Sequence, residues 1–229
     1  MGIQQNIFMA VDAVVFGYHD KKLHLLLIQS AFGTKHDQWA LPGGFVKDTE
    51  TLDQAVKREL VEETGVNANY LEQLYTFSDV DRDPRQRVVS VAYLGLINPK
   101  NYLLKADTDV KDTRWFPIDE IPKLAFDHQN ILKKGKERLI SKINYQPIGF
   151  ELLKKEFPFS DLENLYQTIL DKKIDRRNFR KKILSFGILE ETDKIFQGKG
   201  GRPAKLFRFN EKKYQELEKK GFHFEIKLA

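Results

Sequence analysis

Three glutamates on one predicted helix are the residues of this chain best placed for chemistry. The apolar spacing of residues 51–64 predicts a helix. On that helix Glu59, Glu62 and Glu63 fall on or beside the apolar stripe, not opposite to it. A glutamate-rich helix usually presents a solvated face, but like charges beside buried residues repel one another and lose hydration. We therefore expect a cation to compensate these three acids.

The residue types around the glutamates indicate which cation this would be. Carboxylate oxygens without His or Cys suit Mg²⁺, Mn²⁺ or Ca²⁺. Mg²⁺ is favoured, with Mn²⁺ as a possible substitute, because Mg²⁺ commonly joins one or two carboxylates to substrate phosphates. Pro42, Gly43 and Gly44 form a bend just before the helix, where a backbone carbonyl can face a metal and a phosphate can approach closely. Alone, this bend would be read as a plain glycine turn.

The stretch from Leu41 to Val66 resembles the Nudix box, G-x5-E-x7-R-E-U-x-E-E-x-G-U, in which U is an aliphatic residue. Every specified position of that pattern is filled, by Gly44, Glu50, Arg58, Glu59, Leu60, Glu62, Glu63, Gly65 and Val66. Because many positions match at fixed spacing, the resemblance is far more specific than a lone glycine motif. It implies a strand, loop and helix that bind a divalent metal and cleave a diphosphate linked to another moiety.

The resemblance also implies a role for each residue. Glu59, Glu62 and Glu63 would be metal ligands or the catalytic base, and the carbonyl of Gly43 would be a further ligand. Glu50 would pair with Arg58 and orient a carboxylate. The mechanism would be metal-assisted hydrolysis, in which Mg²⁺ neutralises the diphosphate and a carboxylate deprotonates a bound water.

Active members of the family often add an acid from outside the box. Asp107 and Asp109 are the candidates here, and a solvated acidic loop is an equally good interpretation of both.

Residues 79–87 (DVDRDPRQR) form a second candidate segment. Arg82, Arg85 and Arg87 lie in one short segment with three Asp residues, and arginine binds phosphate or carboxylate through two parallel hydrogen bonds. Alone, the segment would be interpreted as a surface turn with exposed ion pairs. Next to a Nudix box we interpret it as a substrate-binding loop, and it resembles the corresponding loop of ADP-ribose pyrophosphatases and of Nudix-related transcriptional regulators.

The last third of the chain is basic. Residues 148–229 hold 19 Lys and Arg against 13 Asp and Glu, whereas residues 1–147 hold 19 against 20. Such asymmetry suggests a nucleic-acid partner, although a lysine-rich end can also simply keep a protein soluble. Residues 160–163 (SDLE) predict a capped helix, and Asp175 predicts the cap of a second helix that ends near Phe186.

The second helix is basic, and two strand-like runs at 188–196 and 205–209 follow it around a glycine-rich tip. This order resembles a winged helix–turn–helix, in which the basic helix enters the major groove of DNA. A small helical domain with a solvated basic face is the alternative. The candidate DNA-binding residues are Arg176, Arg177, Asn178, Arg180 and Lys181 on the helix, and Lys199 and Arg202 on the tip.

These sites need two folded regions to position them. Short apolar runs at 8–16, 23–28 and 88–97 predict strands, and helical spacing recurs at 129–143. The fold class is α+β, and the resemblance implies a Nudix-type α/β/α sandwich followed by the winged domain. Pro147 and Gly149 place the boundary near there, so we expect domains at 1–147 and 148–229.

Composition excludes several other classes of protein. The chain has 229 residues and no Cys, which rules out a disulfide scaffold, a thiolate metal site and a Cys nucleophile. No apolar run reaches the length of a membrane span and no secretory signal is visible, so we expect a cytoplasmic protein without a membrane partner.

Together these features predict a metabolite-sensing DNA-binding regulator, because the order of the motifs resembles the Nudix-related transcriptional regulators. Its Nudix domain would bind, and could hydrolyse, an ADP-ribose-like nucleotide or sugar-phosphate ligand with Mg²⁺. A homodimer is expected, because paired winged domains bind the two half-sites of a pseudo-palindrome on double-stranded DNA. The alternative is a working pyrophosphohydrolase whose basic domain serves RNA contact or dimerisation.

Overall fold

The computed structural model describes residues 6–30, 38–105, 110–197, 203–221 and 224–225. The chain divides into two compact units, Met1–Arg138 and Leu139–Ala229, which we call the first and the second unit. The division falls inside helix α2 (His128–Tyr145). It is a division by packing, so the domain boundary expected at residue 147 stays a prediction.

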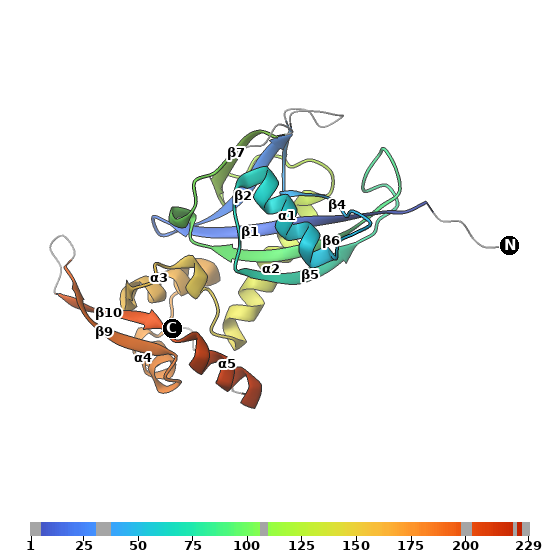
Figure 1. The fold of residues 1–229 in the computed structure, drawn as a ribbon. Coiled ribbons are helices and arrows are strands. Elements are labelled where there is room, and N and C mark those ends of the chain that lie inside the picture. Colours follow the sequence, from blue (N-terminus) through green and yellow to red (C-terminus); the bar gives the residue numbers. More distant parts are fainter. Residues whose placement is uncertain (1–5, 31–37, 106–109, 198–202, 222–223, 226–229) are drawn as a thin grey trace. The chain divides into compact units, whose positions relative to one another are not determined.

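A seven-stranded mixed sheet forms the centre of the first unit (Figure 1). Strand β1 pairs in parallel with β6 and antiparallel with β2 and β4, so the strands predicted at 8–16 and 23–28 are confirmed and form a hairpin. The elements of this unit, besides α2, are β1 (Phe8–His19), β2 (Lys22–Ser30), β3 (Trp39–Ala40), β4 (Gly43–Phe45), α1 (Leu52–Thr64), β5 (Tyr70–Phe77), β6 (Val88–Ile97), the 3₁₀ turn η2 (Pro99–Asn101) and β7 (Val110–Pro117).

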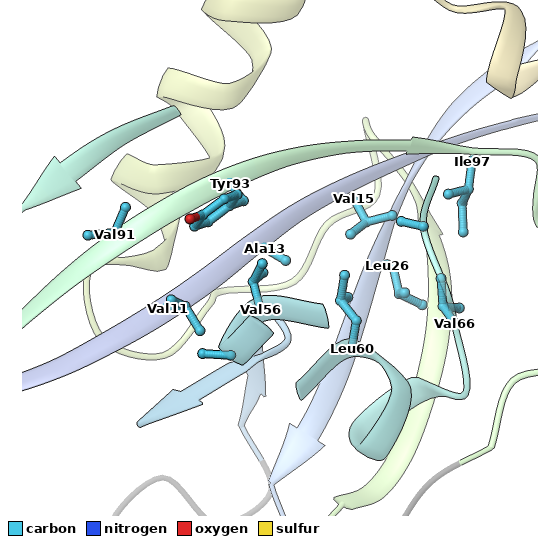
Figure 2. Packing of buried hydrophobic residues seen from close by; sticks show 12 residues of the cluster. Val11, Ala13, Val15, Leu26, Val56, Leu60, Val66, Val91, Tyr93 and Ile97 are labelled. Atoms are coloured by element: carbon cyan, nitrogen blue, oxygen red, sulfur yellow. The ribbon is translucent and has the colours of Figure 1, made fainter. Parts of the chain in front are cut away.

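Helix α1 covers one face of the sheet. Side chains of a strand point alternately to its two faces, so Val11, Ala13 and Val15 of β1 share a face. Figure 2 shows Val56 and Leu60 of α1 beside these residues in one buried apolar cluster. Burying this stripe fixes how α1 is rotated on the sheet, and therefore which way its glutamates point.

Helix α2 covers the opposite face. Val14, which lies between Ala13 and Val15, points away from α1. A Cβ atom on Gly135 of α2 would lie 2.8 Å from Cγ1 of Val14, so the helix backbone approaches the sheet closely there. The helix, sheet and helix layers confirm the α/β/α sandwich.

The second unit combines helices with a three-stranded sheet in the order β8-β10-β9. Phe159, Tyr166, Phe179 and Phe207 are buried in its aromatic core. This arrangement confirms the expected helices and hairpin. The elements are η3 (Phe150–Leu152), β8 (Phe157–Pro158), α3 (Phe159–Leu170), α4 (Arg176–Ser185), β9 (Leu189–Phe196), β10 (Ala204–Phe209) and α5 (Glu211–Lys220).

One expected helix cap is wrong. Helix α3 begins at Phe159, directly after Pro158, and no side chain caps it. Ser160 therefore lies inside the first turn, because the fixed φ of Pro158 and the burial of Phe159 start the helix earlier. The other predicted cap is confirmed, since Asp175 accepts a hydrogen bond from the Asn178 amide at 3.0 Å.

None of the helices in the described part of the chain combines the length and the apolar composition needed to cross a lipid bilayer.

Candidate functional site

Strand pairing places the glycine turn against the centre of the sheet. Gly43 lies opposite Asp12 and Gly44 opposite Val11, because β4 pairs with β1. A Cβ atom on Gly43 would lie 2.1 Å from the Val11 carbonyl oxygen, and one on Gly44 would lie 2.4 Å from Oε1 of Glu59. Gly43 therefore requires glycine, because backbone atoms of β1 leave no room for a side chain, whereas a side chain at Gly44 would displace the carboxylate of Glu59.

Two of the three predicted glutamates meet this turn. Oε2 of Glu63 accepts a hydrogen bond from the Gly43 amide at 2.8 Å, and Glu59 packs on Gly44. Glu62 differs, because its side chain is 46% exposed. The expectation that all three acids are held against apolar neighbours is therefore correct for Glu59 and Glu63 only. Glu62 lies at the edge of the stripe and reaches solvent.

Arg58 is the cation of α1 that contacts these acids, and several of them share it. Its Nε and Nη2 donate to the two oxygens of Glu50 at 2.9 and 2.6 Å, and Nη1 donates to Glu59 at 2.7 Å and to Glu62 at 2.9 Å. The hydrogen bonds from Arg58 lower the pKa of Glu50 to about 2. Glu50 and Arg58 thus form the pair that the motif implies.

Positive charge is scarce at Glu63. Burial, together with repulsion from the nearby acids, raises the pKa of Glu63 to about 8, although the hydrogen bond from the Gly43 amide opposes this change. Burial also raises the pKa of Glu59, although Arg58 opposes this change. Buried carboxylates with too little positive charge, all of them hard oxygen donors, fit a divalent cation such as Mg²⁺.

The acids do not form a finished metal cage. Within the described residues, no three Asp, Glu or His side chains converge on one metal position. The reason is visible at Arg58, which bonds to Glu59 and Glu62 and draws their oxygens toward itself. The metal roles of Gly43, Glu59, Glu62 and Glu63 therefore stay predictions.

A buried polar cluster next to the turn was not predicted from the sequence. We use this name for Asp12, Arg82, Asp127 and His128. Arg82 donates through Nε and Nη2 to the carboxylate of Asp127 at 3.0 and 2.7 Å, and Nη2 also lies 3.3 Å from Oδ2 of Asp12. Ser90 donates to the same Asp12 oxygen at 2.5 Å. The cluster joins β1, the loop at residues 79–87 and the start of α2, and Ser90 connects it to β6.

His128 connects this cluster to the glycine turn. Its Nδ1 accepts a hydrogen bond from the Leu41 amide at 2.9 Å, and its Nε2 lies 3.3 Å from Oδ1 of Asp12. An accepting Nδ1 assigns the proton to Nε2. Burial lowers the pKa of His128, consistent with a neutral ring. One sequence signal could have revealed this site, because Asp12 is the single charged residue in the apolar run 8–16.

The three arginines of the predicted substrate loop have different surroundings. Arg82 is only 8% exposed and is held by the cluster. Arg85 pairs with Asp83 at 2.6 Å, and its guanidinium carbon lies 5.3 Å from the centroid of the Phe126 ring. Arg87 donates to the carbonyl oxygens of Ser78 and Asp79.

A cavity of about 220 Å³ brings these groups together. Arg82 and Arg85 line it, whereas Arg87 is not among its lining residues. Acids, arginines, a histidine and the glycine turn share the lining, so one polar ligand could meet both signs of charge. The charged and turn residues of the lining are Asp12, Gly43, Gly44, Glu63, Arg82, Asp83, Arg85 and His128. Asp107 and Asp109 lie outside the described residues.

Helix α4 of the second unit presents the predicted DNA-binding residues. Phe179 and Ile183 are buried and anchor the helix, while Arg176, Arg177 and Lys181 are exposed. Arg176 is not free, because its Nε and Nη2 bond to Glu163 at 2.9 and 2.6 Å. Arg177 and Lys181 have no charged or hydrogen-bonding partner within the described chain.

Two further residues of α4 are exposed but held. The side chain of Asn178 donates to Asp175 at 2.6 Å. The guanidinium carbon of Arg180 lies 4.5 Å from the Phe159 ring centroid and 5.7 Å from that of Phe207. These contacts orient both side chains. Lys199 and Arg202 lie outside the described residues.

Each of the two units matches the model of a known protein family. Residues 7–135 match the model of the NUDIX domain, and residues 149–209 match the NrtR DNA-binding winged helix domain. The chain is 36% identical over 207 residues to the ADPR responsive transcriptional repressor NtrR of Acinetobacter baylyi, covering 88% of this chain and 81% of that protein.

Solved structures give the same result. The crystal structure of Shewanella oneidensis NrtR complexed with a 27mer DNA matches with a TM-score of 0.82 and 30% identity, covering 96% of this chain and 99% of that one. The NUDIX domain of the same protein, complexed with ADP ribose, matches with a TM-score of 0.55 and 36% identity, covering 59% and 90%. An ADP-ribose pyrophosphatase of Methanocaldococcus jannaschii is 40% identical over 126 residues, covering 55% and 70%.

Proposed function

The chain belongs to the Nudix family and carries an NrtR-type winged helix domain, and on this premise we propose that it is a DNA-binding repressor that responds to ADP-ribose. The observation that carries the proposal is the presence of both sites in one chain. A cavity with acids and arginines lies in the first unit, and an exposed basic helix lies in the second. The similarity to the DNA complex of NrtR spans 96% of the chain and so includes both units.

ADP-ribose suits the first unit because it is a diphosphate with sugar hydroxyls at both ends. Arg82 and Arg85 would bind the diphosphate, because guanidinium groups match its oxygens. Glu59 and Glu63 would hold Mg²⁺ together with the phosphate oxygens, with Mn²⁺ as a substitute. Arg87 contributes indirectly, since its bonds to carbonyl oxygens hold the loop.

Hydrolysis of the bound ligand is a second activity that one observation favours. The catalytic pattern is complete, from Gly44 to Val66, and an ADP-ribose pyrophosphatase is among the relatives. A bound divalent cation would neutralise the diphosphate and lower the pKa of a water molecule. Glu63 or Glu59 would accept the proton of that water, and Arg58 would hold Glu59 and Glu62 in place.

The second unit would bind double-stranded DNA through α4. Arg177 and Lys181 would contact phosphates, because they are exposed and carry no internal partner in the described chain. Asn178 and Arg180, which the unit holds in fixed orientations, are better placed to contact bases. A homodimer would bind two half-sites about one helical turn apart.

A DNA-binding titration tests this proposal. A labelled duplex is first selected from random-sequence DNA by the protein, and its fluorescence anisotropy is then measured with and without ADP-ribose and Mg²⁺. We expect tight binding with a steep salt dependence, and a dissociation constant that ADP-ribose changes. Weak binding with a flat salt dependence would instead favour the pyrophosphohydrolase whose basic domain serves RNA contact or dimerisation.

A further inference from the structure

Helix α2 begins differently from three other helices of the chain. At α1, α4 and α5 the residue before the helix is Thr51, Asp175 or Asn210, and its side chain accepts a hydrogen bond from the amide three residues later at 3.3, 3.0 or 2.9 Å. Asp127 has the same position before α2, and Asp is among the preferred capping residues. Its carboxylate instead accepts hydrogen bonds from Arg82 through both oxygens, and within the described residues it accepts none from an amide of α2.

The first turn of α2 retains a donor that a cap would satisfy. The carbonyl oxygen of Asp127 accepts from the amides of Asn130 and Ile131 at 2.8 and 3.3 Å. The amide of Gln129 has no acceptor within the described residues. A capping carboxylate normally accepts from the second or third amide of a helix, which here belong to Gln129 and Asn130. Asp127 therefore lies next to a helix end that lacks the cap it could provide.

The carboxylate of Asp127 can bind either Arg82 or the free amide of α2, and Arg82 also lines the cavity. A diphosphate in the cavity would compete with Asp127 for the guanidinium, because both are anions that bind it through charge-assisted hydrogen bonds. Asp12 would still face Arg82 on its other side. A carboxylate that loses its arginine at the start of a helix gains an alternative partner in the amides and the positive end of the helix dipole.

We propose that Asp127 is a positioning residue that switches between two partners. It holds Arg82 when the cavity has no anionic ligand, and it caps α2 when a nucleoside diphosphate-linked ligand takes over Arg82. This proposal rests on the proposed function, because it assumes that the ligand binds beside Arg82. Helix α2 starts in the first unit and continues past Arg138 to Tyr145 in the second, so the switch acts on an element that both units share.

The variant Asp127→Asn tests the switch. Asparagine can still cap a helix but carries no charge, so it releases Arg82 and favours the capped state without ligand. ADP-ribose should then bind at least about fivefold more tightly, and the ratio of DNA dissociation constants with and without ADP-ribose should fall toward one.

Glu72→Gln is the matched control. It weakens the ion pair of Glu72 with Arg138, 2.9 Å long, which also anchors α2 but lies away from the lining of the cavity. This variant should keep the wild-type ratio. A wild-type ratio and wild-type ligand affinity in Asp127→Asn would overturn the proposal, and so would an equal loss of response in Glu72→Gln.

A measurement on the wild-type protein separates the switch from the function. Amide hydrogen exchange of Gln129, followed by NMR, should slow when ADP-ribose is added, and it should not slow in Asp127→Ala. An unchanged rate in wild-type protein saturated with ADP-ribose would overturn the switch. DNA affinity that does not change when ADP-ribose is added would overturn the proposed function. Slower amide exchange of Gln129 in that same protein would still support the capping step.

Discussion

The acidic residues of α1 and the basic residues of α4 differ in how far their charges are exposed to solvent. Glu59 and Glu63 are partly buried, and burial raises the pKa of both. Arg177 and Lys181 are exposed and have no partner within the described chain. In α1 the charge is costly without a counter-ion, whereas in α4 the charge is fully hydrated and costs little.

This difference indicates what each surface binds. A partly buried acid pair suits a small, dense cation that can enter a confined space. An exposed basic helix suits a long polyanion, because many weak, screened contacts add up along its backbone. The burial of a charge therefore distinguishes a site for an ion from a surface for a polymer.

The largest expected effect is on hydrolysis in the first unit. Glu63→Gln should lower kcat for ADP-ribose with Mg²⁺ by about 10²–10⁴-fold, the usual contribution of a positioned proton acceptor. Cleavage of the diphosphate linkage of ADP-ribose is measured by chromatography of the products. Glu120→Gln, an exposed acid of the same unit paired with Lys22 at 3.5 Å, is the control and should retain activity. Equal turnover in wild type and Glu63→Gln would remove Glu63 from the chemistry.

A smaller effect is expected on metal affinity. Gly44→Ala adds a Cβ atom 2.4 Å from Oε1 of Glu59, so the carboxylate must move. We expect Mn²⁺ affinity to fall by roughly 10–100-fold, as when the support of a metal ligand is lost. Calorimetric titration with MnCl₂ measures it. Gly187→Ala is a control for glycine loss, because its new Cβ would meet no atom within 4 Å, although its positive φ costs some stability. Unchanged Mn²⁺ affinity in Gly44→Ala would place the metal elsewhere.

The DNA affinity of the second unit should depend on salt concentration and not on a bound metal. Arg177→Ala and Lys181→Ala should each flatten the slope of log affinity for DNA against log salt by about one unit. Arg176→Ala should change it less, because Glu163 already neutralises Arg176 at 2.6 Å. Anisotropy at several salt concentrations gives the slopes. Identical slopes for all three variants would contradict the distinction between basic side chains that are paired with an acid and those that are not.

The smallest expected effect is on thermal stability, when either of two ion pairs is removed and the pH is varied. The folded pKa of Glu50 is about 2, below its ordinary value of 4.5, so its stabilisation is present above pH 4.5 and is lost as the pH falls toward 2. Glu50→Gln should lower Tm at pH 7, and the difference from wild type should vanish near pH 2, with a chelator present throughout. Glu190→Gln, which breaks an exposed pair with Arg208, should change Tm less. A difference that persists at pH 2 would mean that packing, and not charge, explains it.

The sequence predicted elements with strong periodicity and missed those without it. The apolar stripe of α1 and the runs that form β1, β2 and β6 were sufficient to place these elements. Strands β5 and β7 were not predicted, because residues such as Glu72 and Lys111 interrupt their apolar pattern. Their pairing with β6 and β2 is a long-range property that local spacing does not encode.

The candidate site follows the same rule. Glu50, Arg58, Glu59 and Glu63 lie within one short stretch, so their spacing was sufficient to bring them together. The buried polar cluster joins residues such as Asp12 and His128 from opposite ends of the first unit, and only the folded sheet places them side by side.

Crystals soaked in MnCl₂ and ADP-ribose, and measured for the anomalous signal of manganese, test the central contrast most directly. We predict a strong peak beside the carboxylates of Glu59 and Glu63 and none along α4. A map without a peak at those glutamates, with their side chains turned into solvent, would contradict the account.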